Sequence, residues 1–309
     1  MALLIYSPTH PVADWGAAIR ALAPDLDIRL WPDMGDPADI DVALVWKPPA
    51  GLLPSLPNLK LMQSFGAGVD GILADPNIPR HVPLARVVDG NLTIGMTEYV
   101  LLHVLHFHRQ VAAMQQNQRS GRWQWLPPVA ASERVVGIMG MGTLGCHAAK
   151  KLVDFGFQVA GWSRGLKAVD GVTSFHGDEH LDGFLRICNV LVCLLPLTPA
   201  TRGIICRRTL SLLPRGAYVI NAARGGHVVD DDLLHALDSD WLSGATLDVF
   251  NEEPLREGHP FWTHPKVTVT PHNAADSIPA QVAPQIVDNI RRLQAGQPIL
   301  RLVDYSRGY

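Results

Sequence analysis

The sequence is poor in the features that mark secreted and metal-binding proteins. Only 4 of its 309 residues are cysteine, and no two of them form a Cys-x-x-Cys pair. This argues against a disulfide framework and favours reduced thiols in the core of a cytoplasmic protein. The 13 histidines include no His-Glu-x-x-His motif, so we expect no metal site.

Long hydrophobic runs and a surplus of one charge are also missing. The formal net charge is −3, which argues against a general basic surface for nucleic acid or anionic membrane. The opening MALLIYSPTH has no basic segment and too short an apolar run for a signal peptide. The run YVLLHVLHF is too short for a membrane span and contains histidine. We expect a cytoplasmic protein that binds neither nucleic acid nor membrane.

The sequence does contain short apolar segments that alternate with helical ones, and its length suggests two domains. A first series consists of ALLIYS, DIRLW, DVALVW, LKLMQSF and LARVVD. A helical stretch over 98–118 follows, and then a second series of RVVGIMG, FQVAGWS, NVLVCLLP, AYVINAA, GATLDVF and KVTVTP. This alternation predicts the α/β class, with two Rossmann-like or flavodoxin-like domains built on parallel sheets. A last helix is expected over about 278–295, and it has no strand after it in the second series.

The second series opens on a glycine fingerprint, Gly140-x-Gly142-x-x-Gly145, between an apolar strand and a helix. Gly140 permits a tight turn, Gly142 lets the backbone approach a pyrophosphate, and Gly145 lets helix and strand pack closely. The helix N-terminus offers free N–H groups to phosphates. We predict a dinucleotide site; a glycine-rich turn without a ligand is the plainer alternative.

The segment after the next strand indicates which dinucleotide is bound. An NAD-binding domain has Asp or Glu there to bind the ribose hydroxyls, whereas this chain has Ser163 and Arg164, with Lys167 nearby. A hydroxyl, a guanidinium and an ammonium suit a phosphate dianion. NADP(H) is therefore the predicted cofactor, and a solvated surface arginine is the alternative.

Three polar residues follow three later strands of the same series. Arg224 comes after AYVINAA, Glu253 after GATLDVF and His272 after KVTVTP. Each alone has an ordinary interpretation as a surface arginine, a loop acid or a capping histidine. Ligands of open α/β sheets bind at the carboxyl ends of strands, so the three together predict a reactive site.

Across almost its whole length the sequence resembles the D-isomer-specific 2-hydroxyacid dehydrogenases, and within them the glyoxylate/hydroxypyruvate reductase A group. The phrases that carry the resemblance are ALVWKPP, FGAGVDGIL, LLPLTPATRGII, NAARGGHVVDDDLLHALDS, GATLDVFNEEPL, VTVTPHNAA and the terminal DYSRGY. The resemblance implies a dinucleotide-binding Rossmann domain, 98–273, inserted into a substrate domain, 1–97 and 274–309, with the active site in a cleft between them. The implied reaction is NADPH-dependent reduction of glyoxylate and hydroxypyruvate to glycolate and D-glycerate.

The resemblance also implies individual roles. His272 would be the proton donor with Glu253 as its partner, and Arg224 would bind the substrate carboxylate and carbonyl oxygen. Backbone N–H groups of Ala67 and Gly68 would hold the carboxylate, and Trp46 would line the pocket. The expected cofactor contacts, some of them on the nicotinamide side with Thr198, are Gly140, Met141, Gly142, Thr143, Leu144, Ser163, Arg164, Lys167, Leu195, Pro196, Thr201, Ala222 and Asp248.

Other functions on related folds fit less well. No tyrosine has a lysine four residues on, as a short-chain reductase needs, and L-specific lactate and malate dehydrogenases begin with their nucleotide domain. Another D-2-hydroxyacid specificity, or a non-catalytic NADP(H)-sensing protein, stays open. Asn273 stands where an apolar residue is usual, and Lys47 lies beside Trp46; both positions bear on substrate fit.

Trp123 and Trp125 lie in a connection rich in helix-breaking residues, SGRWQWLPP. They could cover the core of their own domain. The resemblance implies instead a homodimer formed through the nucleotide domains, in which one tryptophan reaches the partner's substrate site.

Overall fold

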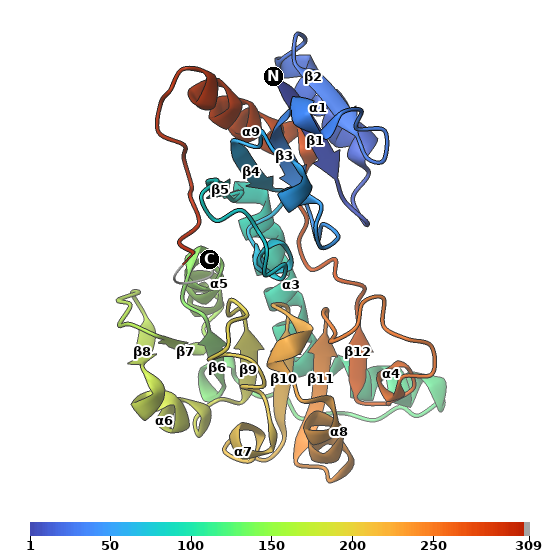
Figure 1. Ribbon diagram of the computed structural model, residues 1–309. Helices are drawn as coiled ribbons and strands as arrows, with labels where there is room; N and C mark the ends of the chain where they lie inside the picture. Colours follow the sequence, from blue (N-terminus) through green and yellow to red (C-terminus); the bar gives the residue numbers. More distant parts are fainter. Residues whose placement is uncertain (306–309) are drawn as a thin grey trace. The chain divides into compact units, whose positions relative to one another are not determined.

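The computed structural model describes residues 1–305, and its contacts divide the chain into two compact units, Met1–Leu92 with Asp276–Tyr309, and Thr93–Ala275. Residues 306–309, the end of the phrase DYSRGY, lie outside the described part. Each unit is an open parallel sheet with flanking helices, which confirms the predicted α/β class (Figure 1). Within residues 1–305 no helix has the length and apolar character needed to cross a bilayer.

The first unit has a five-stranded sheet in the order β2-β1-β3-β4-β5. Every pairing is parallel, and the order is the flavodoxin-like one. Helices α1 and α9 pack against each other on this sheet (Figure 1). The elements are β1 Ala2–Tyr6, α1 Val12–Leu22, β2 Asp27–Leu30, η1 Pro37–Asp39, β3 Ile40–Val45, η2 Leu53–Ser55, β4 Leu61–Ser64, α2 Asp70–Leu73, β5 Leu84–Ala85 and α9 Pro279–Gln294.

The second unit has a seven-stranded sheet in the order β12-β11-β10-β9-β6-β7-β8, again all parallel. This is the Rossmann strand order with one strand added beyond β11. The strands are β6 Val135–Met139, β7 Gln158–Ser163, β8 Val172–His176, β9 Val190–Cys193, β10 Ala217–Asn221, β11 Leu242–Leu247 and β12 Val267–Val269.

Apolar clusters cover both faces of this second sheet, so its central strands are fully buried. The helices are α3 Gly90–His108, α4 Val111–Arg119, α5 Thr143–Asp154, α6 Leu181–Leu185, α7 Arg207–Leu210 and α8 Asp230–Asp238. Short 3₁₀ helices are η3 Ala131–Glu133, η4 Asp178–His180, η5 Gly225–His227 and η6 Pro260–Trp262. The four cysteines are free thiols, and Cys188 and Cys193 are buried in this core.

Two elements differ from the prediction. The single helix expected over 98–118 is two helices, because Gln110 adopts a left-handed backbone with φ 55°. Strand β8 was missed: it is an edge strand, only half-buried and with the sequence VTSFH, so it gives no apolar run to detect.

Candidate functional site

The candidate residues of the second unit lie along one edge of its sheet. Because all seven strands are parallel, their carboxyl ends share that edge. The glycine loop follows β6, and β9 lies beside β6 where the strand order reverses. Such a reversal is where open α/β sheets bind ligands.

The three glycines of the fingerprint occupy three distinct environments. Gly140 has φ +107°, and a Cβ there would lie 2.6 Å from the carbonyl oxygen of Leu194. A Cβ on Gly145 would meet the carbonyl oxygen of Gly140, so helix α5 starts close against the strand. Gly142 caps α5, and a Cβ there would meet open space. Met141 is buried beneath the loop, whereas Thr143 is exposed and Leu144 is half-buried.

The helix α5 begins without a side-chain cap. Its first N–H groups therefore stay available beside the open space over Gly142. They provide a cradle of backbone donors and a positive dipole end, as a pyrophosphate requires.

The loop after β7 is exposed and basic. Ser163 closes the strand, and its hydroxyl donates to the carbonyl of Gly165 at 2.8 Å. Arg164 and Lys167 are both exposed on the same loop. Ser163 thus stands where an NAD-binding domain has an acidic residue, and the guanidinium of Arg164 follows it at the sheet edge.

The loop after β9 is organised by Thr201. Its hydroxyl donates to the carbonyl of Pro196 at 2.7 Å and accepts the N–H of Thr198 at 2.9 Å. Leu195 is buried and Pro196 is exposed. Thr201 therefore shapes the loop from within.

Arg224 follows β10 and the buried Ala222. The Arg224 backbone is extended, with φ −147°, and its carbonyl accepts the side-chain N–H of the fully buried Asn221 at 2.9 Å. The guanidinium donates to the carbonyl of Ala223 and stays half-exposed at the strand end. The Asn221 contact fixes the direction in which this residue leaves the sheet.

The side chains of His272, after β12, and Glu253, after β11, contact each other, as the resemblance implied. Nδ1 of His272 lies 2.8 Å from Oε2 of Glu253, and Oε1 of Glu253 accepts the N–H of Phe250 at 3.1 Å. The side chains are 30% and 17% exposed, respectively. Because Nδ1 faces the carboxylate, Nε2 is the ring nitrogen left to face a substrate.

The His272 backbone is held in the left-handed region, with φ +53°. A non-glycine residue there requires support from its surroundings. Asp248 provides it: its side chain is buried, and its carboxylate accepts the N–H groups of Asn273 and Ala274 at 3.0 Å each and the hydroxyl of Thr270 at 2.6 Å. The N–H of His272 also donates to the Asp248 carbonyl at 2.8 Å. Asp248 therefore builds the loop that carries His272.

In the first unit the predicted substrate residues follow neighbouring strands. Trp46 comes directly after β3, and Ala67 and Gly68 follow β4. A Cβ on Gly66 would lie 3.4 Å from the Trp46 ring, so glycine allows that ring to lie against the turn. Ser64 supports the turn by donating to the Gly68 carbonyl at 3.0 Å.

Sequence reasoning missed His10 at this edge. Its ring stacks on Phe65 with centroids 5.1 Å apart and meets Trp46 edge-on at 5.6 Å. Nδ1 lies 2.8 Å from the Ser7 hydroxyl, and Nε2 lies 3.5 Å from the Asp276 carboxylate. No motif indicates such a residue; only its position in the loop that follows the first strand could have drawn attention to it.

Comparison with known proteins shows the family to which the chain belongs. Residues 101–274 match the family model of the D-isomer specific 2-hydroxyacid dehydrogenase NAD binding domain. The chain belongs to the D-isomer specific 2-hydroxyacid dehydrogenase family. The match includes the glycine loop, Arg224, Glu253 and His272 and covers more than half of the chain.

Relatives of the family align with the entire chain. A glyoxylate/hydroxypyruvate reductase A of Yersinia enterocolitica is 42% identical, with 100% of both chains covered. A family member from Xanthobacter autotrophicus Py2, solved in complex with NADPH and MES, is 47% identical with a TM-score of 0.94, covering 100% of this chain and 99% of that one. An NADPH-dependent glyoxylate/hydroxypyruvate reductase from Sinorhizobium meliloti, solved with NADP and sulfate, is 39% identical with a TM-score of 0.93 and the same coverage.

One group of side chains in this dehydrogenase has the residue types of a metal site. His176, Glu179 and His180, in the spacing His-x-x-Glu-His, bring one potential ligand atom each to within 4.8 Å of one another. This spacing went unnoticed in the sequence. However, Nδ1 of His180 lies 2.7 Å from the carbonyl oxygen of His176, to which it must donate. That nitrogen could bind a metal only after the ring turned.

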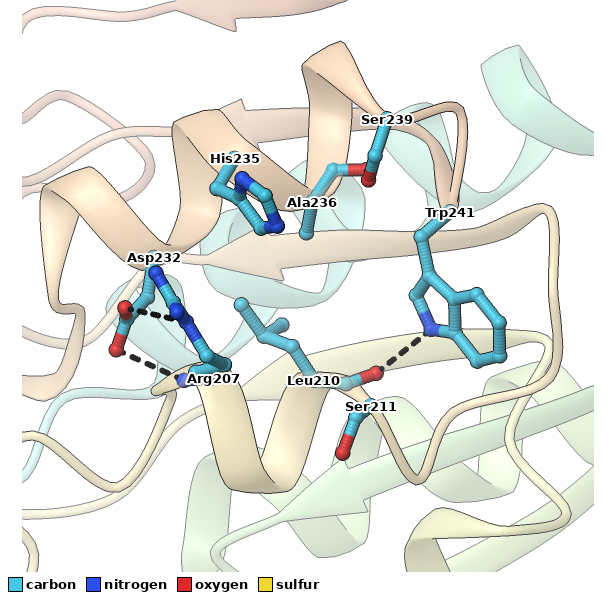
Figure 2. A pocket seen from close by; sticks show the side chains of 8 residues that line it. All are labelled: Arg207, Leu210, Ser211, Asp232, His235, Ala236, Ser239 and Trp241. Atoms are coloured by element: carbon cyan, nitrogen blue, oxygen red, sulfur yellow. Dashed lines mark hydrogen bonds and ion pairs between the residues drawn. The ribbon is translucent and has the colours of Figure 1, made fainter.

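A separate pocket of about 190 Å³ lies between α7 and α8 (Figure 2). Arg207 and Asp232 pair at 3.5 Å at one end, and the indole N–H of Trp241 donates to the Leu210 carbonyl at 3.0 Å at the other. Trp241 directly precedes β11, so its end of the pocket lies toward the amino ends of the strands. Its lining residues are Arg207, Leu210, Ser211, Asp232, His235, Ala236, Ser239 and Trp241.

Proposed function

We propose that this dehydrogenase is an NADPH-dependent reductase of small 2-oxoacids, which converts glyoxylate to glycolate and hydroxypyruvate to D-glycerate. The observation that carries the proposal is the 2.8 Å ion pair of His272 and Glu253 on the sheet edge that also bears the glycine loop. Relatives named glyoxylate/hydroxypyruvate reductase along the full chain support the substrate class.

The residues present fit NADP(H). The open space over Gly142 and the uncapped start of α5 suit the pyrophosphate, and Ser163, Arg164 and Lys167 suit a 2′-phosphate. When bound, the cofactor supplies the hydride. The proposed contacts are Gly140, Met141, Gly142, Thr143, Leu144, Ser163, Arg164, Lys167, Leu195, Pro196, Thr201, Ala222 and Asp248, of which Thr201 and Asp248 act chiefly by shaping their loops.

Three side chains perform the protein's part of the chemistry. Arg224 binds the carboxylate of the oxoacid and polarises its carbonyl, for which a planar guanidinium is suited. His272 donates a proton from Nε2 to the oxygen that becomes the hydroxyl. Glu253 accepts the Nδ1–H hydrogen bond of His272 at 2.8 Å, which orients the imidazole.

The first unit is proposed to hold the rest of the substrate. The backbone N–H groups of Ala67 and Gly68 would receive the carboxylate, and Trp46 would line the pocket. The second unit is proposed to be the cofactor domain. A cytoplasmic location is also proposed, because all four cysteines are free thiols.

We further propose a homodimer formed through the second unit. Trp123 is fully exposed, and Trp125 is 76% exposed. Leu102 on α3 and Met114 on α4 add exposed apolar surface to the same unit. Such side chains are poorly suited to water and indicate a partner. The interpretation that both tryptophans cover the core of their own domain is wrong.

The test is turnover of NADPH with glyoxylate and with hydroxypyruvate, followed by the loss of NADPH absorbance. We expect saturable oxidation with both and lower kcat/KM for bulky 2-oxoacids. A protein that bound NADPH tightly but reduced no 2-oxoacid would be the non-catalytic sensor instead. Strong preference for a larger oxoacid would establish a different specificity within the family.

A further inference from the structure

His227 is a buried titratable residue to which the proposed chemistry gives no role. It ends the short helix η5, three residues after Arg224, and none of its surface is exposed. A fully buried histidine needs partners for its ring nitrogens. Those partners identify what it does.

Both ring nitrogens of His227 face backbone carbonyl oxygens. Nδ1 lies 3.0 Å from the oxygen of Arg224, and Nε2 lies 3.3 Å from the oxygen of Pro196. A carbonyl only accepts, so each nitrogen must carry a proton to satisfy its partner. The geometry therefore favours the doubly protonated ring.

The surroundings of the ring agree with this protonation state. Burial by itself lowers the pKa of His227, but the neighbouring Cys193 sulfur and the two carbonyls outweigh it and raise the pKa to about 9. Cys193 is itself fully buried at the end of β9. Two guanidinium groups also lie near this turn, that of Arg224 and that of Arg202, which lies beside Gly226.

The two carbonyls belong to two different loops of the site. Backbone bonds already join these loops farther along: the N–H of Gly203 donates to Gly226 at 2.8 Å, and that of Ile205 donates to His227 at 2.8 Å. No such backbone bond is present at Pro196 within residues 1–305. There, the hydrogen bonds of the His227 side chain join the two loops.

We propose that His227 is a positioning residue for the 2-oxoacid: it locks the Arg224 loop to the Pro196 loop, so that the guanidinium keeps a fixed place beside the nicotinamide wall. The inference rests on the proposed function, since Arg224 and Pro196 matter only if they face substrate and cofactor. It assigns to His227 a role in oxoacid affinity and none in the affinity for the adenosine half of the cofactor.

The test compares His227→Leu and His227→Gln with the control His103→Gln. His103 is another buried histidine of the second unit, and its partner is Thr246 at 3.2 Å, in strand β11. Oxamate, an unreactive analogue of a small 2-oxoacid, is titrated into the enzyme–NADPH complex, and the KM for glyoxylate and the Kd for NADPH are measured alongside. Hydrogen exchange of residues 196–205 and 224–229 reports directly on whether the two loops stay joined.

His227→Leu removes the side chain that joins the two loops, although Asn221 and Thr201 still donate to the Arg224 and Pro196 carbonyls. We expect it to weaken oxamate binding and raise the glyoxylate KM by about tenfold. The Kd for NADPH should stay within about twofold, and exchange should accelerate in both segments. His227→Gln retains a donor and should lose less oxamate affinity.

Wild-type affinity for oxamate should fall as the pH rises through about 9, and the Gln variant should lack this step because glutamine does not titrate. His103→Gln should leave oxamate binding and its pH dependence unchanged.

Unchanged oxamate affinity in folded variants of an active enzyme would overturn the role of His227, even if exchange increased, because the tie would then be structural only. The Gln variant provides the comparison if the Leu variant does not fold. A wild-type enzyme that bound NADPH but neither oxamate nor glyoxylate would instead refute the proposed function, and the inference would fall with it.

Discussion

His272 combines an unusual backbone with an ordinary side-chain contact. Its positive φ is supported by Asp248, whose carboxylate holds the two residues that follow. Its ring is aligned by Glu253. The imidazole is thus fixed from the backbone and from the side chain, and this arrangement keeps Nε2 in one place for the proposed proton transfer.

We expect His272→Ala to lower kcat for glyoxylate reduction by about 10²–10⁴-fold, the usual contribution of a positioned acid. Glu253→Gln should lower kcat less, because the ring remains but loses the carboxylate that orients it. The Kd for NADPH, measured by fluorescence titration, serves as the control and should not change. Near-native turnover by His272→Ala across the pH range would contradict the assignment.

Arg164 sits exposed at the end of β7 and should decide the choice of cofactor. Hydrogen bonds to a charged group contribute about 1.5–3 kcal/mol each, so we expect kcat/KM to favour NADPH over NADH by tenfold or more. Arg164→Asp should reverse the preference, because a carboxylate repels the 2′-phosphate and accepts the ribose hydroxyls.

Arg186→Asp provides the matched control for Arg164→Asp, since Arg186 is another exposed arginine of the same unit, after α6. The Arg186→Asp variant should have the same cofactor preference as the wild type. An enzyme that used both cofactors equally well before any substitution would refute the role of Arg164.

The site was predicted from sequence where a residue type alone indicates chemistry. The glycine spacing, the basic replacement at Arg164 and polar residues after buried strands are local patterns. His227 could not be found in this way, because its role depends on a carbonyl 31 positions earlier in the chain, at Pro196. Asn221 is similar: within the buried run AYVIN it looks like a core position, and only the contact with Arg224 distinguishes it.

Among the elements, α3 is fastened to the sheet by polar side chains as well as apolar ones. The hydroxyl of Tyr99 lies 2.7 Å from that of Thr270, and Nδ1 of His103 lies 3.2 Å from the hydroxyl of Thr246. Burial, with a smaller effect of His106, lowers the pKa of His103 to about 4. The helix therefore packs with a neutral imidazole beneath it.

The low pKa of His103 predicts how acid affects the stability of the fold. The unfolded chain binds a proton at His103 below pH about 6.5, whereas the folded chain does so only near 4. The contribution of His103 to the free energy of unfolding, up to about 3 kcal/mol, is present above pH 6.5 and is lost as the pH falls through about 4. Urea unfolding at pH 7 and pH 4.5 should show a smaller loss of stability for His103→Gln than for the wild type. An equal loss in both would show that His103 does not titrate in this way.

Elements were predictable where their pattern was strong. The strands β1, β6 and β10 are almost wholly buried and appear in the sequence as uninterrupted apolar runs. The break between α3 and α4, where Gln110 adopts the left-handed conformation, was not predictable, because neither Arg109 nor Gln110 is a helix breaker. Beyond the turn, the side chain of Gln110 donates to the Pro127 carbonyl at 2.8 Å, a contact that follows from the tertiary fold.

At the scale of the whole molecule, the order of the units explains why the glycine fingerprint appears only at Gly140. The first unit is interrupted after Leu92 and completed from Asp276 onward, and the cofactor-binding motif belongs to the inserted unit. Unit one carries Trp46, Ala67 and Gly68 after its strands β3 and β4, and unit two carries Arg224 and His272 after its own strands. The proposed chemistry needs both sets, so isolated expression of residues 93–275 should bind NADPH but reduce no oxoacid.

The connection that contains Trp123 and Trp125 links one chain to its partner in the proposed dimer. Both indoles project from the second unit with most of their surface exposed, and a symmetric dimer lets each chain supply the same ring to the other. Sedimentation should show a dimer at assay concentrations. Alanine at the contributing tryptophan should raise the KM for hydroxypyruvate and improve the relative kcat/KM of bulky oxoacids, because an aromatic wall of the pocket is gone. Trp262→Ala, at an exposed indole in η6, is the control. A fully active monomer, or unchanged kinetics in both Trp123→Ala and Trp125→Ala, would refute the shared site.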